Sequence, residues 1–121
     1  MKTLSLVKFR DGLPREAAWR AWAEHTRRWD GRDHPEIRMT RLTLFGEGEG
    51  DGGANDGWDG MGLTEWSSAE AFQAAAAWYQ TPASAAHAAD LGSFMDLERM
   101  LTIVIADECA IPGPPLAGEP G

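Results

Sequence analysis

The sequence predicts an α+β fold in a single domain, and three observations support this prediction. Apolar residues dominate or alternate over four segments, as expected of strands: 2–9, 36–46, 60–66 and 100–106. Two other segments, 14–29 and about 68–80, carry apolar residues at helical spacing. The chain has 121 residues, which is enough for one hydrophobic core and too few for a second catalytic domain.

The first helix is expected to follow a turn at residues 11–14, with the proline at the first helical position. Ala18, Trp22, His25 and Trp29 then recur at i, i+4, i+7 and i+11, which forms one apolar stripe. The stripe predicts that His25 lies on the buried face of this helix.

Strict alternation along the second strand sorts its side chains onto two faces. It places Arg41 on the same face as Met39 and Phe45, and Leu42 and Leu44 on the other. Arg41 is thereby expected among apolar side chains.

Residues 46–60 are rich in glycine and in acidic residues, which predicts a mobile, solvated hairpin loop. Its acids suggest calcium, but an EF-hand counted from Asp51 has Gly53 at the third position and Gly62 at the twelfth, where oxygen ligands are required. We therefore expect no metal site here.

A capping box at residues 67–70 predicts the start of the second helix, and Pro82 predicts its end. A short helix over about 82–90 carries His87 and leads toward the last strand. The chain ends in a Pro/Gly-rich tail, residues 112–121, which is expected to form no core.

The order strand, helix, strand, strand, helix, strand is typical of the ferredoxin-like arrangement, a four-stranded antiparallel sheet with its helices on one face. The strands are apolar on both sides, so the face without helices must also be covered. A second copy of the same sheet is the simplest cover, and a homodimer is therefore expected.

Charge and composition exclude several partners. Eleven Lys and Arg against 19 Asp and Glu give a net charge of −8, the wrong sign for binding nucleic acid or anionic membranes. No segment approaches the roughly 18 apolar residues of a membrane span, and the N-terminus reads as a strand rather than a signal peptide. The single cysteine, Cys109, can form no intrachain disulfide, which favours the cytoplasm. No activating cation lies beside it in the sequence, so we expect no nucleophilic chemistry from it.

Several stretches occur in an order and spacing that resembles the EthD family of dimeric α/β-barrel proteins. They are Gly12-Leu13-Pro14-Arg15-Glu16 after the opening strand, Trp19, Trp22 and His25 in the first helix, Trp58-Asp59-Gly60, Trp66 before Ser68 and Phe72, and Phe94-Met95-Asp96. The resemblance covers residues 1–111 and implies an EthD-like dimeric α/β barrel. Members of this superfamily look like catalysts without cofactors, including polyketide cyclases, dehydratases and quinone-forming monooxygenases, while others have no established activity. The resemblance therefore implies a pocket in each subunit for an apolar substrate and no cofactor, without identifying the substrate.

Three side chains are candidate catalytic groups. His25 lies between Trp22 and Trp29 on its helix face, so it is desolvated, neutral near pH 7 and able to act as a general base. The alternative is a core histidine bonded to a backbone carbonyl. Asp96 is a candidate to orient a histidine or to act as an acid, and its alternative role is to close a turn. His87 is a candidate second catalytic group, and the alternative is that it is simply exposed.

The candidate substrate-binding residues are Trp22, Arg41, Trp66 and Phe94. The aromatic side chains either line a cavity or belong to the core. Arg41 either binds a substrate carboxylate or enolate, or forms an ion pair in the dimer interface. His34 is expected in a surface loop.

Ser-His-Asp, zinc-ligand and nucleotide-binding glycine patterns are absent from the sequence. The sequence thus predicts a cofactor-independent enzyme that cyclises, dehydrates or rearranges an apolar polyketide-like or aromatic metabolite by acid/base catalysis. The alternatives are a cofactor-free monooxygenase and a non-catalytic protein, which carries an apolar ligand or serves as accessory subunit of an oxygenase.

Overall fold

The computed structural model describes residues 1–29, 37–46, 53 and 55–118. In chain order its elements are β1 (Lys2–Val7), α1 (Arg15–Trp29), β2 (Ile37–Leu44), β3 (Gly60–Trp66), α2 (Ala69–Trp78), a 3-10 turn (Pro82–Ser84), α3 (Ala85–Gly92) and β4 (Leu101–Ile105). The segment around His34 and the loop residues 47–52 and 54, which include Asp51, lie outside the described residues. In the described part, no helix is long and apolar enough to cross a membrane.

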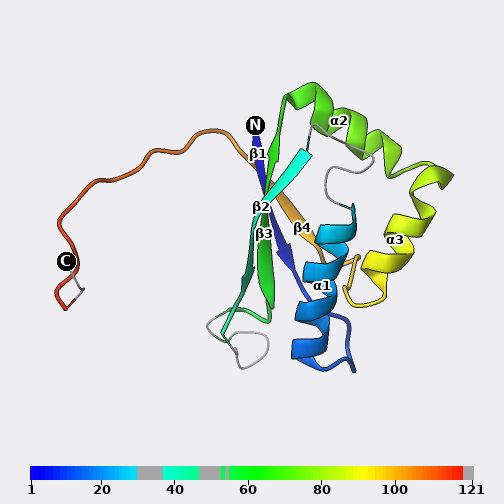
Figure 1. Cartoon of the computed structure of the whole chain (residues 1–121), viewed down its shortest axis with the longest axis horizontal. Coiled ribbons are helices and arrows are strands. Elements are labelled where there is room, and N and C mark those ends of the chain that lie inside the picture. Colours follow the sequence, from blue (N-terminus) through cyan, green and yellow to red (C-terminus); the bar gives the residue numbers. More distant parts are fainter. Residues whose placement is uncertain (30–36, 47–52, 54, 119–121) are drawn as a thin grey trace.

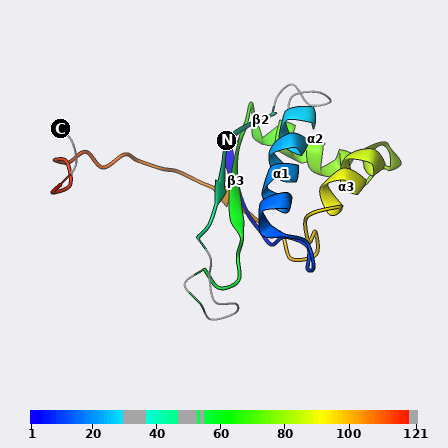
Figure 2. The same ribbon diagram turned by 60° about the horizontal axis from the view of Figure 1, so that its bottom comes forward.

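The four strands form one antiparallel sheet in the order β2-β3-β1-β4. The three helices lie on one side of this sheet, and no described helix lies on the other (Figures 1 and 2). The predicted fold class is therefore confirmed: a four-stranded antiparallel α+β fold of the ferredoxin-like kind. We call the side facing the helices the inner face and the opposite side the outer face.

The core fills the space between α1 and the inner face. Its buried side chains are Val7, Phe9, Ala18, Trp22, Phe94 and Met95. Gly60 and Gly62 lie on β3 beneath the Trp22 ring, and a Cβ on either glycine would stand 3.2 or 3.3 Å from that ring. The two glycines thus allow the indole to approach the strand backbone closely.

The helices begin and end close to the predicted positions, with one difference at α2. The N-cap of α2 is Ser68, whose hydroxyl accepts a hydrogen bond from the amide of Ala71 at 3.0 Å. The predicted capping box had assigned this role to Ser67, with Glu70 as its partner. The cap therefore lies one residue later, and the interruption predicted at Pro82 coincides with the first residue of the 3-10 turn.

Strand β2 differs from the prediction because it contains a β-bulge. Met39 pairs with Thr64 and Arg41 with the adjacent Leu63, so Thr40 is the extra residue, and its hydroxyl donates to the Leu63 carbonyl at 3.2 Å. An extra residue exchanges the two faces of the rest of the strand. The prediction that Arg41 shares a face with Met39 was wrong: Arg41 is exposed on the outer face, and the two leucines of β2 pack against the core.

Candidate functional site

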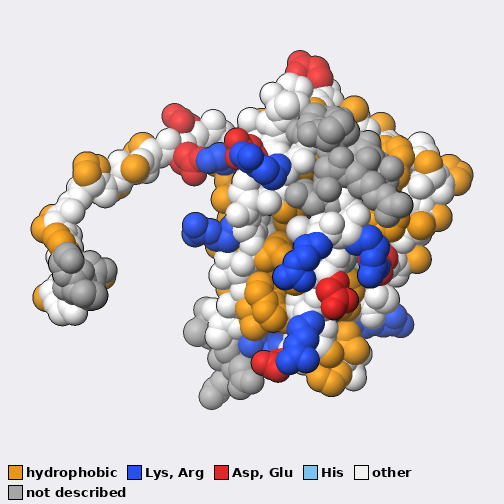
Figure 3. Space-filling view, in the orientation of Figure 1, with side chains coloured by type: hydrophobic (Ala, Val, Ile, Leu, Met, Phe, Trp, Pro, Cys, Tyr) orange, Lys and Arg blue, Asp and Glu red, His pale blue; other side chains and the backbone are white. Residues whose placement is uncertain are grey.

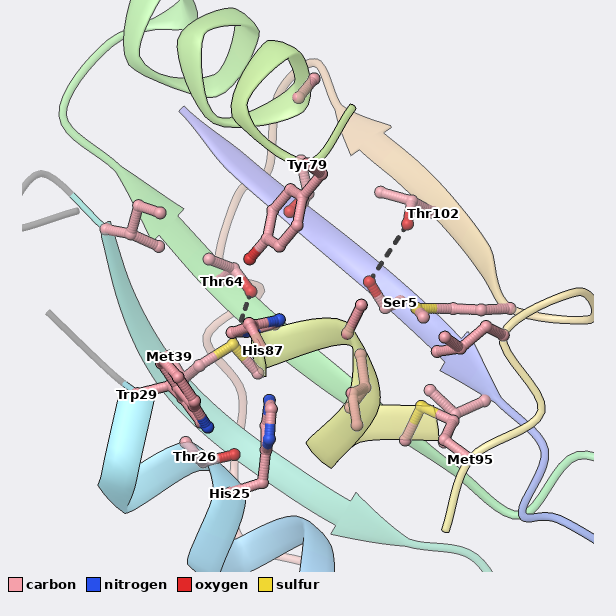
Figure 4. Close-up of a pocket in the computed structure, with 18 of the residues that line it drawn as sticks. Ser5, His25, Thr26, Trp29, Met39, Thr64, Tyr79, His87, Met95 and Thr102 are labelled. Carbon is pink, nitrogen blue, oxygen red and sulfur yellow. Dashed lines mark hydrogen bonds between the residues drawn. The ribbon is translucent and has the colours of Figure 1, made fainter. Parts of the chain in front are cut away.

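A pocket of about 640 Å³ lies between the inner face of the sheet and the helices (Figure 4). This volume is in the range of pockets that bind small organic molecules. All four strands and all three helices contribute to its lining. The resemblance implies a pocket in each subunit, and this chain has one by itself.

The walls of the pocket are aromatic and its floor carries a row of hydroxyl groups. Six large aromatic side chains line it: Trp22, Trp29, Trp66, Phe72, Trp78 and Tyr79. Four hydroxyls on the sheet face it: Thr3, Ser5, Thr64 and Thr102. The pocket therefore combines flat apolar walls with polar atoms that can fix the orientation of an oxygenated ligand.

The hydroxyls of the floor are held by short local contacts. Thr3 accepts a hydrogen bond from Nε1 of Trp66 at 3.0 Å, which leaves its own proton available to donate. Thr64 donates to the sulfur of Met39 at 2.8 Å, and Ser5 lies 3.3 Å from Thr102. A sulfur atom is a weak acceptor, so the Thr64 hydroxyl is also suited to bind a polar ligand atom.

His25 is anchored by a carboxylate that the sequence did not indicate. His25 is 6% exposed, and its Nδ1 lies 2.7 Å from Oδ2 of Asp90, which belongs to α3. Asp90 also accepts hydrogen bonds from Nε1 of Trp29 at 3.1 Å and from the Arg28 guanidinium at 3.0 Å. With three donors around it, Asp90 is ionised, so Nδ1 of His25 must carry the proton of their shared hydrogen bond.

The protonation of this pair follows from its surroundings. Burial lowers the pKa of His25 below its ordinary value of 6.5; the hydrogen bond and charge of Asp90 raise it, and Arg28 lowers it further, for a net decrease. The pKa of Asp90 is lowered, first by the hydrogen bond from His25 and then by Trp29 and Arg28. The neutral form of His25 with a free Nε2 lone pair is therefore favoured near pH 7.

The remaining nitrogen of His25 is available for chemistry. Among the described residues, Nε2 of His25 has no hydrogen-bond partner, and the ring lines the pocket. Figure 4 shows the ring pointing from α1 toward His87. A general base needs such an unpaired, accessible lone pair beside the bound ligand.

His87 lies beside His25 at the helix end of the pocket. The two ring centroids are 4.6 Å apart in an edge-to-face arrangement. His87 also contacts the rings of Trp29, Tyr79 and Trp78, with centroids 5.3, 5.1 and 6.1 Å away. It is half-buried and lines the pocket, so the two candidate histidines share one site.

Asp96 does not lie at this site. Its carboxylate binds Arg99 at 2.9 Å, its backbone amide donates to the carbonyl of Lys8, and it does not line the pocket. These contacts correspond to the turn-closing alternative. The acid that orients a histidine is Asp90, which lies three residues after His87 on α3, a spacing that gives no sign of its contact with His25.

The other predicted binding residues divide into two groups. Trp22 and Trp66 line the pocket. Phe94 is buried in the core and packs against His25, with centroids 5.9 Å apart, but it does not line the pocket. Arg41 is on the outer face, away from the cavity. The candidate set lacked four pocket aromatics: Trp29 at the end of α1, Phe72 and Trp78 of α2, and Tyr79 directly after α2.

Comparison with known proteins agrees on the fold. No family model matches the chain, and no curated protein matches it. A dimeric protein of unknown function and ferredoxin-like fold from Bacteroides fragilis covers 84% of this chain and 90% of its own, at 14% identity and a TM-score of 0.54. A NIPSNAP-like domain protein from Burkholderia xenovorans covers 94% and 90%, at 15% identity and a TM-score of 0.55.

A third solved structure has a described activity. SnoaB, a cofactor-independent oxygenase from Streptomyces nogalater, covers 93% of this chain and 98% of its own, at 16% identity and a TM-score of 0.50. At such identities the likeness establishes the fold alone. The EthD resemblance stays a resemblance, because none of these comparisons names that family.

Proposed function

We propose that this protein is a cofactor-independent enzyme that acts on an oxygenated, largely apolar aromatic or polyketide-like metabolite, with His25 as its general base. One observation carries the proposal: Asp90 holds Nδ1 of His25, whose ring lines the pocket, and Nε2 has no hydrogen-bond partner among the described residues. This is how a carboxylate fixes the tautomer and orientation of a catalytic histidine. In this proposal Asp90 is a positioning residue.

The chemistry begins with removal of an acidic proton by Nε2. A carbon between two carbonyl groups, or a phenol, gives up its proton to Nε2, and the electron pair remains on the substrate as an enolate or phenolate. The negative charge of Asp90 stabilises the imidazolium, 2.7 Å away. In this proposal the Thr3 hydroxyl, which lines the same pocket and keeps its own proton, donates to the developing oxyanion.

The proton then returns in a way that depends on the substrate. In a cyclisation, the enolate carbon attacks a second carbonyl group and the imidazolium protonates the new alkoxide. In a dehydration, the imidazolium protonates a departing hydroxyl, which leaves as water. His87, in ring contact with His25, is the second group that can carry a proton at this site.

The second candidate function is a cofactor-free oxygenase. It is favoured by the described activity of SnoaB, whose fold this chain shares. Here the deprotonated substrate supplies electrons to O₂; one oxygen atom enters the substrate, and the other leaves as water with two substrate hydrogens. The same base serves both candidates, since each begins with proton removal.

We further propose that the chain forms a homodimer through its outer face, with an EthD-like domain over residues 1–111. Apolar side chains from three neighbouring strands lie on that face: Leu4, Leu6, Met61, Leu63, Leu101, Ile103 and Ile105. Ile103 is 44% exposed in a single chain. Burial of such a surface against a second copy is favourable, and the Bacteroides fragilis protein of like fold is described as dimeric.

The test is a comparison of turnover with binding. Purified protein is incubated with a panel of hydroxylated aromatic and β-polycarbonyl compounds, with and without O₂, and products are identified by mass spectrometry. A product of unchanged mass indicates cyclisation, and a product that has lost water indicates dehydration. A product that gains oxygen only when O₂ is present indicates an oxygenase. Binding is followed by quenching of the pocket tryptophans.

His25→Gln is expected to keep binding and to lower turnover about 100-fold or more, because only the base is lost. Asp96→Asn, outside the pocket, serves as the matched control and keeps both. Binding of several compounds with turnover of none would instead identify a non-catalytic binding protein. Equal loss of binding and turnover in His25→Gln would contradict a role of His25 specific to the reaction.

A further inference from the structure

We propose that residues 107–118, here called the C-terminal arm, pack on a second copy of the chain. This inference rests on the homodimer proposed above. It starts from the direction of the arm: the chain leaves β4 and extends on the side of the sheet opposite α1, α2 and α3 (Figures 1 and 2). That is the side on which the outer face meets its partner.

The root of the arm is fixed to the body of its own chain. Glu108 forms an ion pair with Lys2 of β1. Beyond this point, residues 109–118 contain no helix or strand. The arm therefore starts from a defined position and reaches outward.

The arm carries large apolar side chains far from its own core. Ile111 is 84% exposed and Leu116 is 74% exposed, and Figure 3 shows hydrophobic side chains along the arm, clear of the body of the molecule. Removal of exposed aliphatic side chains from water by a partner surface lowers the free energy of the system. Two of them on one short segment are typical of an anchor.

The backbone of the arm is stiff enough to hold these side chains outward. Pro112, Pro114 and Pro115 restrict φ and favour the extended polyproline conformation. At about 3.1 Å per residue, the arm from residue 107 to residue 116 spans roughly 28 Å, close to the width of a small domain. It is long enough to cross from one subunit onto another.

Charge indicates where the arm meets the second copy. Asp107 adds a negative charge to the root, where Glu108 is paired with Lys2, and β2 carries the exposed cations Arg38 and Arg41. Strands β2 and β4 are the two edges of the sheet. A two-fold axis along the strands stacks β4 of one subunit over β2 of the other and keeps the level along the strands. Because Ile105 is level with Arg38 across the sheet, the root that follows Ile105 comes to the Arg38 end of β2 in the second copy.

The first experiment measures the dimer dissociation constant by sedimentation equilibrium. The double variant Ile111→Ser/Leu116→Ser is expected to raise this constant about tenfold or more, since both anchors are lost. Ala110→Ser/Ala117→Ser changes exposed arm residues without removing large apolar groups, and it should leave the constant unchanged. If both double variants have the wild-type dissociation constant, the proposed role of the arm is wrong but the homodimer stands. If the wild type is a monomer, both the homodimer and the role of the arm are wrong.

The second experiment locates the arm. A nitroxide is attached to Ala117→Cys in a Cys109→Ser background, and this chain is mixed with an ¹⁵N-labelled Cys109→Ser chain. We expect the spin label to broaden amide signals of the ¹⁵N-labelled copy, which carries no label itself. If broadening occurs only when label and ¹⁵N share one chain, the arm folds back on its own subunit and the inference is wrong.

Discussion

The side chain of Asp90 acts on His25 in two ways, because it fixes the tautomer of the ring and opposes the loss of its positive charge. Burial still prevails, so the pKa of His25 is below 6.5. In Asp90→Asn, His25 loses its hydrogen bond to a charged carboxylate and the attraction of that charge, while the ring stays buried. The pKa of His25 should then fall further, as measured by NMR titration of the imidazole signals.

Asp96→Asn is the control for this titration. Asp96 pairs with Arg99 and lies outside the pocket, so the pKa of His25 should not change. A rise of the His25 pKa in Asp90→Asn would contradict the described pair. Turnover in Asp90→Asn should fall along with the pKa, because the ring loses the partner that orients it.

The lowered pKa of His25 also makes the stability of the fold depend on pH. The unfolded chain binds a proton at His25 more readily than the folded chain does, so the contribution of this group is complete above pH 6.5. It is lost as pH falls from that value through the lower pKa of the folded state. Urea unfolding at a series of pH values should show this decline, and His25→Gln should show less of it.

The stabilisation by Asp90 is complete above its ordinary pKa of 3.8 and is lost in a separate window below that value. Since its pKa is lowered in the folded state, its stabilisation is lost only as pH falls through that range. A decline between neutral pH and pH 5 that is equally steep in wild type and His25→Gln would show that His25 is not its source.

At the scale of elements, the close contact of α1 with the sheet depends on Gly60 and Gly62, which have no side chains. A Cβ on Gly62 would lie 2.9 Å from Cε of Met39 and 3.2 Å from the Trp22 ring. Gly62→Ala should therefore destabilise the protein by about 1–3 kcal/mol in urea unfolding, through overpacking. Gly60→Ala should cost more, because its Cβ would meet the Thr43 carbonyl oxygen at 2.5 Å.

Gly113→Ala provides the matched control, since nothing lies within 4 Å of a Cβ at that position. Its free energy of unfolding should equal that of the wild type. If Gly62→Ala were equally neutral, the close approach of Trp22 to β3 would be refuted.

The elements themselves were predictable because their signals are local. The helical stripe of α1 placed His25 on a buried face, and the interruption at Pro82 separated α2 from α3. The bulge at Thr40 was not predictable, since alternation alone carries no sign of an inserted residue, and Arg41 was assigned to the wrong face as a result. Asp90 was missed because its contact with His25 joins helices 65 residues apart.

The whole molecule is expected to exist as a pair of subunits. Ile103→Glu puts a charge on the apolar outer face and should give monomers at concentrations where the wild type is dimeric, as measured by sedimentation velocity. Val104 is the adjacent residue on β4 and points to the other face, where it is 54% exposed. Val104→Glu should remain dimeric, and a dimeric Ile103→Glu would show that the subunits associate elsewhere.

The bulge of β2 also bears on how this molecule avoids unwanted assembly. An edge strand offers unpaired amides and carbonyls on which another chain can add a strand, and such growth leads to aggregates. Strand β2 is an edge of this sheet, and its ladder is interrupted at Thr40 between the charged side chains of Arg38 and Arg41. A bulged, positively charged edge is a poor template for a further strand, so the sheet is protected against open-ended extension there and remains free to associate through its face.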